Sequence, residues 1–221
     1  MSRPRRPALT RHPSRRAARA AVPLIGALLS GGLLSTGLVC VGPAPAHAWG
    51  GAVHRIINRN AVSNLPPAFA GFAQWADQLE TLATAADERK DSTPGEGIKH
   101  YIDIDDYPEF LAGTFPHAYT AAVARYGLNR LESNGIGPWA LLASYDQLVL
   151  DFKAKDWTHA VITAGDIGHY AGDLHQPLHI TRNYDGDDTG QSGVHSRFET
   201  TMTGQHLGEF HPLPGVATDL P

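Results

Sequence analysis

Cysteine is almost absent from this chain of 221 residues, and the one that it has, Cys40, lies near the N-terminus. The surrounding segment, residues 1–48, has no Lys, Asp or Glu but contains seven Arg. An apolar run over 22–41 and a small-x-small sequence at 46–48 follow these Arg residues. A basic region, an apolar stretch and such a cleavage site are typical of a secretory signal peptide. We therefore expect residues 1–48 to be removed and the chain to be secreted, by the general route or, given Arg15 and Arg16, by twin-arginine export.

These shortages exclude several classes of site from residues 49–221. With no cysteine in this part, neither disulfides nor thiolate ligands contribute. Seven of the 18 basic residues lie in the signal peptide, so residues 49–221 contain 11 basic and 22 acidic residues. Their net charge is −11 before any metal binds. Such an acidic domain has no basic surface on which to hold nucleic acid or an anionic membrane.

Strand signals are also scarce, so the sequence predicts an all-α fold, a single-domain helical bundle over residues 49–221. Apolar spacing and Pro positions predict helices over 52–64, 68–86, 116–132, 138–154 and 157–174. We expect loops over 87–97 and 182–193, and a partly extended connection over 100–108. Trp75, Trp139 and Trp157 are expected in the core.

Against this background, one stretch is rich in metal-binding side chains. It reads H-x3-D-x5-H-x15-H-x3-E, and its residues are His169, Asp173, His179, His195 and Glu199. A His and an acidic residue four apart project from the same face of a helix. Imidazole and carboxylate are the ligands that Zn²⁺ prefers where no thiolate is present. The pattern therefore predicts a metal site, with zinc as the metal.

Cleavage after Ala48 adds another candidate ligand. Trp49 would then carry a free α-amino group, and His54 follows five residues later. An α-amine has a pKa of about 8, so a metal ion displaces its proton under mild conditions. The amine and carbonyl of Trp49 would form a chelate that His54 completes.

These residues resemble the superfamily shared by bacterial zinc-dependent phospholipase C and the single-strand-specific zinc nucleases. The shared pattern has a Trp at the cleavage site, an early His, an Asp and then a His in a connecting loop, and the two H-x3-acid pairs. GHYAGDLHQPLH is its most specific stretch, and the resemblance runs from Trp49 to Glu199.

The resemblance implies three zinc ions in a cleft of a helical fold. One ion would be held by an Asp that precedes His100, and by His100, His169 and Asp173. A second would be held by Trp49, His54 and Asp173, which bridges the two ions. The third would be held by His179, His195 and Glu199.

Two residues compete to be the Asp before His100. Asp77 lies in QWADQLE, which resembles the Trp-Ala-Asp of the nucleases, whereas Asp87 lies in AADERK at an interval closer to that of both branches. We favour Asp87. Arg89 and Lys90 then fall where the nuclease branch keeps a cation that contacts phosphate, although a solvated basic pair is an equal alternative.

The resemblance also implies a reaction, the hydrolysis of a phosphoric ester. Zinc brings the pKa of a bound water to near 7, so hydroxide is present at neutral pH. Asp173 would hold the bridged pair of ions, and Asp87 would accept a proton or align the nucleophile. The substrate would be a phosphodiester, either a phospholipid or a single-stranded nucleic acid. No stable protein partner is implied, and a membrane would be contacted only as a substrate surface.

Features within the pattern favour different branches. Glu199 in place of Asp and the short interval from His179 to His195 resemble phospholipase C, whereas WGxxxH resembles the nucleases. We favour a phospholipase C-like hydrolase, with a single-strand-specific endonuclease and 3'-nucleotidase as the alternative. A zinc-binding exported protein without turnover is the alternative from another class.

The C-terminal part departs from the family. Only 22 residues follow Glu199, and they include several Pro, whereas family members usually continue through further helix. We expect a truncated C-terminal part that leaves an apolar face uncovered.

Overall fold

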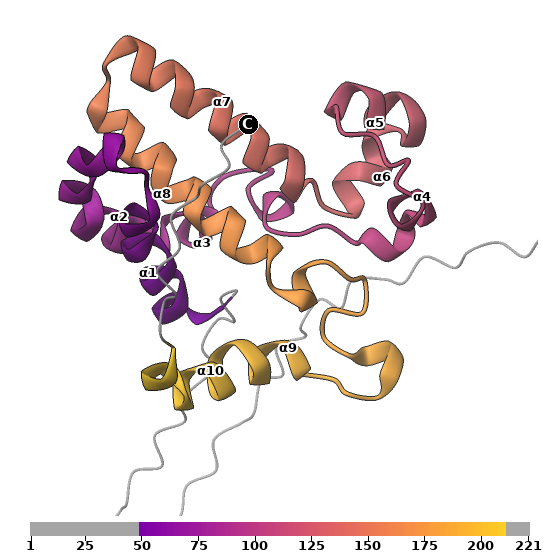
Figure 1. Cartoon of the computed structure of the whole chain (residues 1–221). Helices are drawn as coiled ribbons and strands as arrows, with labels where there is room; N and C mark the ends of the chain where they lie inside the picture. Colours follow the sequence, from indigo (N-terminus) through magenta and orange to yellow (C-terminus); the bar gives the residue numbers. More distant parts are fainter. Residues whose placement is uncertain (1–48, 211–221) are drawn as a thin grey trace, which may run out of the picture. The chain divides into compact units, whose positions relative to one another are not determined.

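Helices make up the regular structure of this chain in a computed structural model that describes residues 49–210 (Figure 1). No strand occurs within that range, which confirms the expected all-α class. The predicted signal peptide, 1–48, and the tail from residue 211 lie outside the described residues. The α-helices, in order, are α1 (Gly50–Ala61), α2 (Ala76–Leu82), α3 (Ala85–Arg89), α4 (Pro108–Leu111), α5 (Tyr119–Tyr126), α6 (Leu128–Ser133), α7 (Gly137–Ala154), α8 (Trp157–Leu174), α9 (Val194–Ser196) and α10 (Thr203–Gln205).

Shorter helical segments of other types connect them. The 3-10 segments are Val62–Asn64, Pro67–Trp75, Gly97–Lys99, Ile104–Asp106, Pro177–His179, Asp187–Thr189 and Leu207–Glu209, and a π-helix spans Arg197–Met202. Between residues 49 and 210 we find no helix with the length and apolar character to cross a bilayer.

The two longest helices, α7 and α8, form an antiparallel hairpin and lie side by side (Figure 1). α7 has Pro138 in its first turn, where proline's missing N–H costs no hydrogen bond. It ends at Lys155, whose φ of 57° is the left-handed conformation that stops a helix. The next residue, Asp156, caps α8 by accepting a hydrogen bond of 3.0 Å from the backbone N–H of His159. Both helices have the predicted bounds to within one residue.

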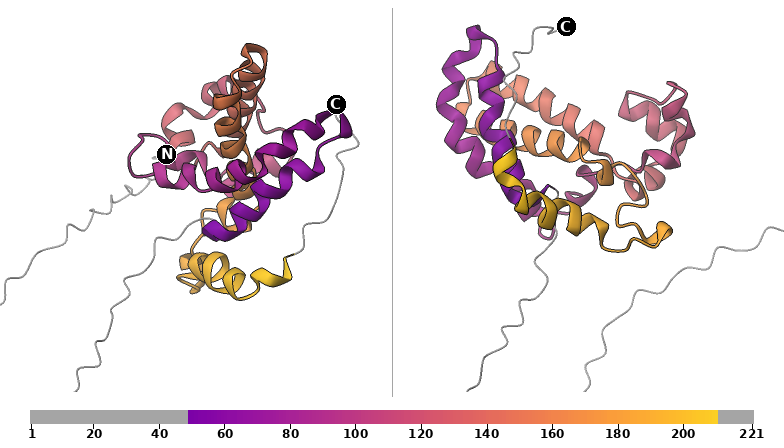
Figure 2. Two further views of the ribbon diagram at one scale, coloured as in Figure 1. Left: turned by 90° about the vertical axis from the view of Figure 1, so that its left-hand side faces the viewer. Right: turned by 60° about the horizontal axis from the view of Figure 1, so that its bottom comes forward.

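A second pair, α1 and α2, packs against α8 (Figure 2). A buried amide lies between these helices. Asn58 of α1 is 1% exposed, and its Nδ2 donates to the carbonyls of Leu79 (3.3 Å) and Gly165 (3.0 Å). A Cβ added at Gly168 would lie 2.1 Å from Asn58 Oδ1. The helices therefore approach too closely for any larger residue at position 168.

The predicted single helix over 68–86 is wrong, because three shorter helical segments occupy this range. A 3-10 segment precedes α2, and the chain leaves helical geometry at Thr84, with φ −108°, before α3 begins. The predicted loop over 87–97 likewise starts inside α3, which carries Asp87. Because α2 stops at Leu82, the carbonyl of Ala83 is free to accept a side-chain hydrogen bond.

The expected helix over 116–132 is also broken, at Gly127. This residue has φ 82° and ψ 148°, outside helical geometry, and it divides α5 from α6. Its φ lies in the region that glycine adopts without strain. The turn folds α6 back, so that α5, α6 and the start of α7 share a core of Ile102, Tyr107, Ala122, Leu131 and Trp139.

Of the three Trp residues expected in the core, Trp139 is buried but Trp157 is not. Trp139 is 7% exposed, whereas Trp157 is 47% exposed. The ring of Trp157 lies 5.6 Å from that of Phe152 and 6.4 Å from that of Trp75. Trp157 therefore belongs to an aromatic cluster that is partly open to solvent.

The connection after His100 is partly extended, as the sequence predicts, and it joins two distant segments. The N–H of Ile102 donates to the carbonyl of His179 at 2.9 Å. In return, Nδ1 of His179 donates to the carbonyl of His100 at 2.7 Å. This reciprocal pairing holds His100 beside His179.

Candidate metal centre

Helix α8 contributes the first two candidate ligands, His169 and Asp173. They are one helical turn apart, both have 0% exposure, and Nε2 of His169 lies 3.3 Å from Oδ2 of Asp173. Their spacing of four residues places both side chains on the same face of the helix. That face points inward, toward segments that come from both ends of the described chain.

The carboxylate of Asp173 lies at the centre of the cluster, and side chains from several segments surround it. Its Oδ2 lies 2.7 Å from Nδ1 of His100, and its Oδ1 lies 3.3 Å from Nε2 of His54. His179 Nδ1 lies 3.8 Å from the same Oδ1. One carboxylate therefore faces histidines from α1, from the loop before residue 101, from α8 and from the turn after α8.

Asp87 lies in this cluster, whereas Asp77 does not. Oδ1 of Asp87 is 3.5 Å from Nε2 of His169 and 3.7 Å from Nδ1 of His100. The side chain of Asp77 is 86% exposed and pairs with Arg59 on the surface at 2.6 Å. Of the two candidates before His100, the structure brings only Asp87 to the other ligands.

A second group is formed by His179, His195 and Glu199. Oε1 of Glu199 lies 3.0 Å from Nε2 of His179 and 2.7 Å from Nε2 of His195. The two imidazole nitrogens are 3.2 Å apart. Glu199 has 0% exposure and sits in the π-helix, a helix type that is frequent at functional sites. The amide of Gln176 also donates to its Oε1.

Backbone carbonyls orient two of the imidazoles. Nδ1 of His169 donates to the carbonyl of Ala83 at 2.7 Å, and Nδ1 of His179 donates to that of His100. In each ring this leaves Nε2 facing the carboxylates. Metal-binding histidines show the same arrangement, in which an acceptor on one nitrogen fixes the ring and directs the other at the metal.

The donor set fits divalent metal ions. Three groups have ligand atoms within 4.8 Å of one another: His54, Asp87 and His169; His100, His169 and Asp173; and His179, His195 and Glu199. Nδ1 of His54 and Oε2 of Glu199 are buried without a hydrogen bond. Buried polar atoms and charges normally have partners, because leaving them without one costs free energy. Zinc ions would supply those partners.

The electrostatics of the cluster keep its carboxylates ionised. Burial opposes the charge of Asp173, but hydrogen bonds with His100, His169 and His54 hold its pKa well below the usual value. Burial also lowers the pKa of His169, yet hydrogen bonds with Asp173 and Asp87 outweigh it and raise that pKa to about 10. Within this cluster the carboxylates therefore favour the protonated form of His169, whereas burial lowers the pKa of His100.

Trp49 lies between two ligand segments. Its Nε1 donates to the carbonyl of Gly172 at 2.8 Å, and its ring lies 5.6 Å from that of Phe198. At the next residue, Gly50, an added Cβ would be 3.0 Å from the carbonyl oxygen of Glu199. Trp49 thus contacts the neighbours of Asp173 and Glu199. Ligation by its amine after cleavage stays a prediction.

The two basic residues proposed to contact substrate have different surroundings. Nζ of Lys90 lies 2.5 Å from Oδ1 of Asp87, at the edge of the cluster. Arg89 instead pairs with Glu96 at 3.1 Å and with Asp166 at 2.9 Å. Its guanidinium is therefore engaged by two carboxylates of the protein.

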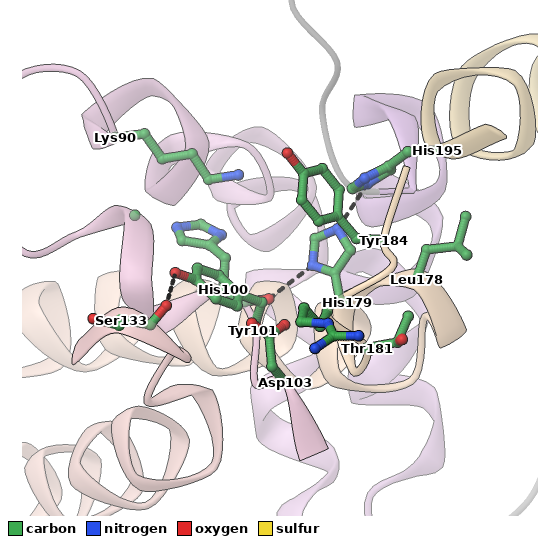
Figure 3. Close-up of a pocket in the computed structure, with 12 residues that line it drawn as sticks. Lys90, His100, Tyr101, Asp103, Ser133, Leu178, His179, Thr181, Tyr184 and His195 are labelled. Carbon is green, nitrogen blue, oxygen red and sulfur yellow. Dashed lines mark hydrogen bonds between the residues drawn. The ribbon is translucent and has the colours of Figure 1, made fainter. Parts of the chain in front are cut away.

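A cavity of about 480 Å³ opens onto three of the candidate ligands (Figure 3). His100, His179 and His195 face it, and Lys90 lies on the side of His100 that is away from His195. Tyr101 and Tyr184 add aromatic surface. A small molecule or an exposed chain segment can therefore reach the cluster.

Sequence reasoning did not single out Glu96, Tyr170 or Gln176, although all three are buried beside the ligands. The hydroxyl of Tyr170 donates to Glu96, and Gln176 donates to Glu199. Gln176 lies inside HQPLH, and Tyr170 directly follows His169, so their positions next to ligands were the available signal.

Comparison with known proteins gives one partial match. The chain is 34% identical over 107 residues to a probable serine protease of Bradyrhizobium tropiciagri. The match covers 41% of this chain and only 14% of the bacterial protein. No family model and no solved structure matches the chain.

This match corrects the expected activity. The relative is named as a protease, so the expectation of a phosphoric ester hydrolase, whether phospholipase C-like or nuclease, is contradicted. The pattern of metal ligands does not identify the bond that is hydrolysed, because the same ligand types occur in enzymes with different substrates. The coarser expectation of an enzyme is supported, since the relative is named as one.

Proposed function

We propose that this chain is an exported metal-dependent hydrolase, with three zinc ions bound by its buried cluster of histidines and carboxylates. The observation that carries the proposal is the meeting of three potential ligand groups around Asp173 and Glu199. Seven of the eight side chains in these groups are buried. Their nitrogen and oxygen donors suit zinc in a chain segment without thiolates.

Hydrolysis is the reaction class that this donor set supports. Bound zinc acts as a Lewis acid and makes water a nucleophile at neutral pH, without any redox chemistry. Asp173 lies between His54 and His100. Asp87 lies beside them as an ionised carboxylate, because His169 and Lys90 hold its pKa well below the usual value, and it could align a water molecule. His195 lines the cavity and can contact a substrate there, whereas its partner Glu199 is fully buried.

A serine nucleophile has less support than metal-activated water. Across residues 49–210, no serine hydroxyl is hydrogen-bonded to a histidine ring, the contact that activates a serine. The hydroxyls of Ser92 and Ser133 donate to backbone carbonyls instead. The protease name of the relative makes a peptide the first substrate to test.

The test combines zinc content with turnover. The chain would be purified from an exporting host, its zinc measured by mass spectrometry, and its activity assayed on chromogenic substrates with peptide, carboxylic ester or phosphodiester bonds. We expect zinc to bind and a chelator to abolish turnover. Turnover that survives complete removal of metal would overturn the proposal, as would a protein that binds no zinc.

Asp173→Asn tests the central carboxylate. Because Asp173 faces two of the groups, this change should remove at least one zinc ion per chain and abolish turnover. Asp146→Asn, at an exposed position on α7, is the matched control and should leave both unchanged.

A further inference from the structure

We infer that Glu96 positions His100 for metal binding, within a buried network that also includes Arg89 and Tyr170. The inference rests on the proposed function in that it takes the cluster around Asp173 to be a metal site. It assigns a role to Arg89 that differs from contact with substrate.

The two nitrogens of His100 face different surroundings. Nδ1 faces the ligand cluster, 2.7 Å from Oδ2 of Asp173 and 3.7 Å from Oδ1 of Asp87. Nε2 is buried on the other side of the ring without a hydrogen bond, and it lies 3.9 Å from Oε1 of Glu96. Glu96 is therefore the carboxylate behind this ligand.

Glu96 is held in place from several sides. Its side chain is 2% exposed, Arg89 approaches its Oε1 at 3.1 Å, and Lys99 approaches its Oε2 at 2.8 Å. The hydroxyl of Tyr170 donates to Oε1 as well. Burial opposes the charge of Glu96, but the bonds from Lys99 and Tyr170 hold its pKa below the usual value.

The same network fixes the plane of the His100 ring. Tyr170 packs edge-on against it, with centroids 5.2 Å apart and an interplanar angle of 81°. Tyr170 is 2% exposed and adjoins His169, so its position is set by α8. Arg89 links Glu96 to Asp166 on the same helix, at 2.9 Å. The residue behind His100 is thus anchored to the helix that carries two other ligands.

A carboxylate in this place has a definite effect on a metal ligand. A histidine that binds a metal commonly directs its other N–H at a carboxylate, which fixes the ring and makes the ligand nitrogen more basic. Loss of such a partner lowers metal affinity by about 10–100-fold. At 3.9 Å the attraction between Glu96 and an Nε2–H is electrostatic, because the distance exceeds that of a hydrogen bond.

Glu96→Gln tests this role, since it keeps the size of the side chain and removes its charge. We expect its Zn²⁺ affinity, measured by competition with a chromophoric chelator, to fall about 10–100-fold at one site. The visible spectrum of the Co²⁺-loaded protein should also change. Tyr170→Phe, which removes one donor to Glu96, should show a smaller fall. Glu80→Gln, a partly exposed partner of Arg59, is the matched control and should bind like wild type.

The outcomes separate positioning from a structural role. Unchanged affinity and an unchanged Co²⁺ spectrum in Glu96→Gln would overturn the inference, even if the melting temperature fell. If Glu96→Gln does not fold, Tyr170→Phe provides the test. A Zn²⁺ affinity in Tyr170→Phe equal to that of wild type would then overturn the inference. A wild-type protein that binds zinc but hydrolyses no substrate would contradict the proposed hydrolase function and leave the inference about Glu96 standing. A wild-type protein that binds no zinc would remove both.

Discussion

Asp77 and Asp87 both precede His100, yet their surroundings differ completely. Asp77 is an exposed partner of Arg59, whereas Asp87 is buried within reach of His169 and His100. Sequence alone favoured Asp87 by its interval from His100, and the helical pattern around Asp77 suited a surface residue. The deciding physical fact is the break after α2, which starts a new helix at Ala85 and turns Asp87 inward.

Paired variants test this difference at the residue scale. Asp87→Asn should lower the zinc content by at least one ion per chain, because an amide lacks the charge that a divalent ion requires. Asp77→Asn should bind zinc like wild type. Measurement of bound zinc after gel filtration compares the two directly, and loss of zinc in Asp77→Asn alone would reverse the assignment.

A further prediction concerns His159, which lies outside the metal cluster. Its Nδ1 lies 2.8 Å from Oδ1 of the buried Asp151, which also accepts from Thr163 on α8. The bond with Asp151 raises the pKa of His159 above its usual value of 6.5. A raised folded-state pKa stabilises the fold fully below about pH 6.5, and the effect disappears as the pH rises through the folded pKa.

The prediction compares wild type with His159→Gln across pH. The melting temperature of wild type should exceed that of the variant most at about pH 6, and the gap should shrink toward pH 9. A gap that widens as the pH rises would contradict the assignment of the proton to this pair.

Among individual residues, those in the local pattern were predictable and those that support them were not. His169 and Asp173 follow from a spacing of four residues on one helix. His54 and Trp49 were indicated by the cleavage site, but only the resemblance linked them to Asp173, because nothing local connects them to α8. Glu96 escaped notice because a Glu in a polar loop is usually exposed, and only the tertiary fold buries it.

At the scale of helices, the tight contact between α1 and α8 makes a specific prediction. Gly168→Ala places a Cβ against Asn58 Oδ1, and Asn58 is held by two hydrogen bonds and does not move freely. Overpacking of this kind costs about 1–3 kcal/mol. Chemical denaturation should show that loss in the free energy of unfolding.

Gly204→Ala is the matched control, since nothing lies within 4 Å of its added Cβ. It should stabilise by about 0.5–1 kcal/mol, because alanine loses less backbone entropy in a helix. Equal effects of the two changes would contradict the close approach of α1 and α8.

Helix bounds were predictable where local signals agree. Pro138 and the apolar spacing place α7 and α8 correctly. The structure adds the left-handed Lys155 and the cap at Asp156, which form the turn between them. The helix over 116–132 failed at Gly127, where a glycine inside a helical pattern gives no indication of the φ that packing imposes. Trp157 was misplaced because an apolar side chain on a helix does not reveal whether the facing surface is covered.

For the whole molecule, zinc should stabilise the fold. Ligands come from α1, α3, the loop at His100, α8 and the segment up to Glu199, so the unfolded chain cannot hold them together. At a hundredfold excess over the dissociation constant, a single site adds about 2.7 kcal/mol. For a domain of this size, that raises the melting temperature by roughly 5–11 °C.

Calorimetry of the metal-free and zinc-loaded protein measures the shift. Asp173→Asn should show a smaller one, because a ligand group is lost. An identical shift in wild type and this variant would show that zinc stabilises the fold elsewhere.

The span of the cluster also matters while the chain is being made. His54 and Trp49 leave the ribosome early, but their partners around Gly172 and Glu199 are among the last parts of the described fold to be synthesised. At about 5–20 residues per second, the more than 100 residues between these segments take roughly 6–25 s to synthesise. During that time α1 has no α8 to pack against, and its buried face is open to chaperones or to other nascent chains. The interval between the synthesis of α1 and that of α8 is therefore a period in which the chain is open to misassembly.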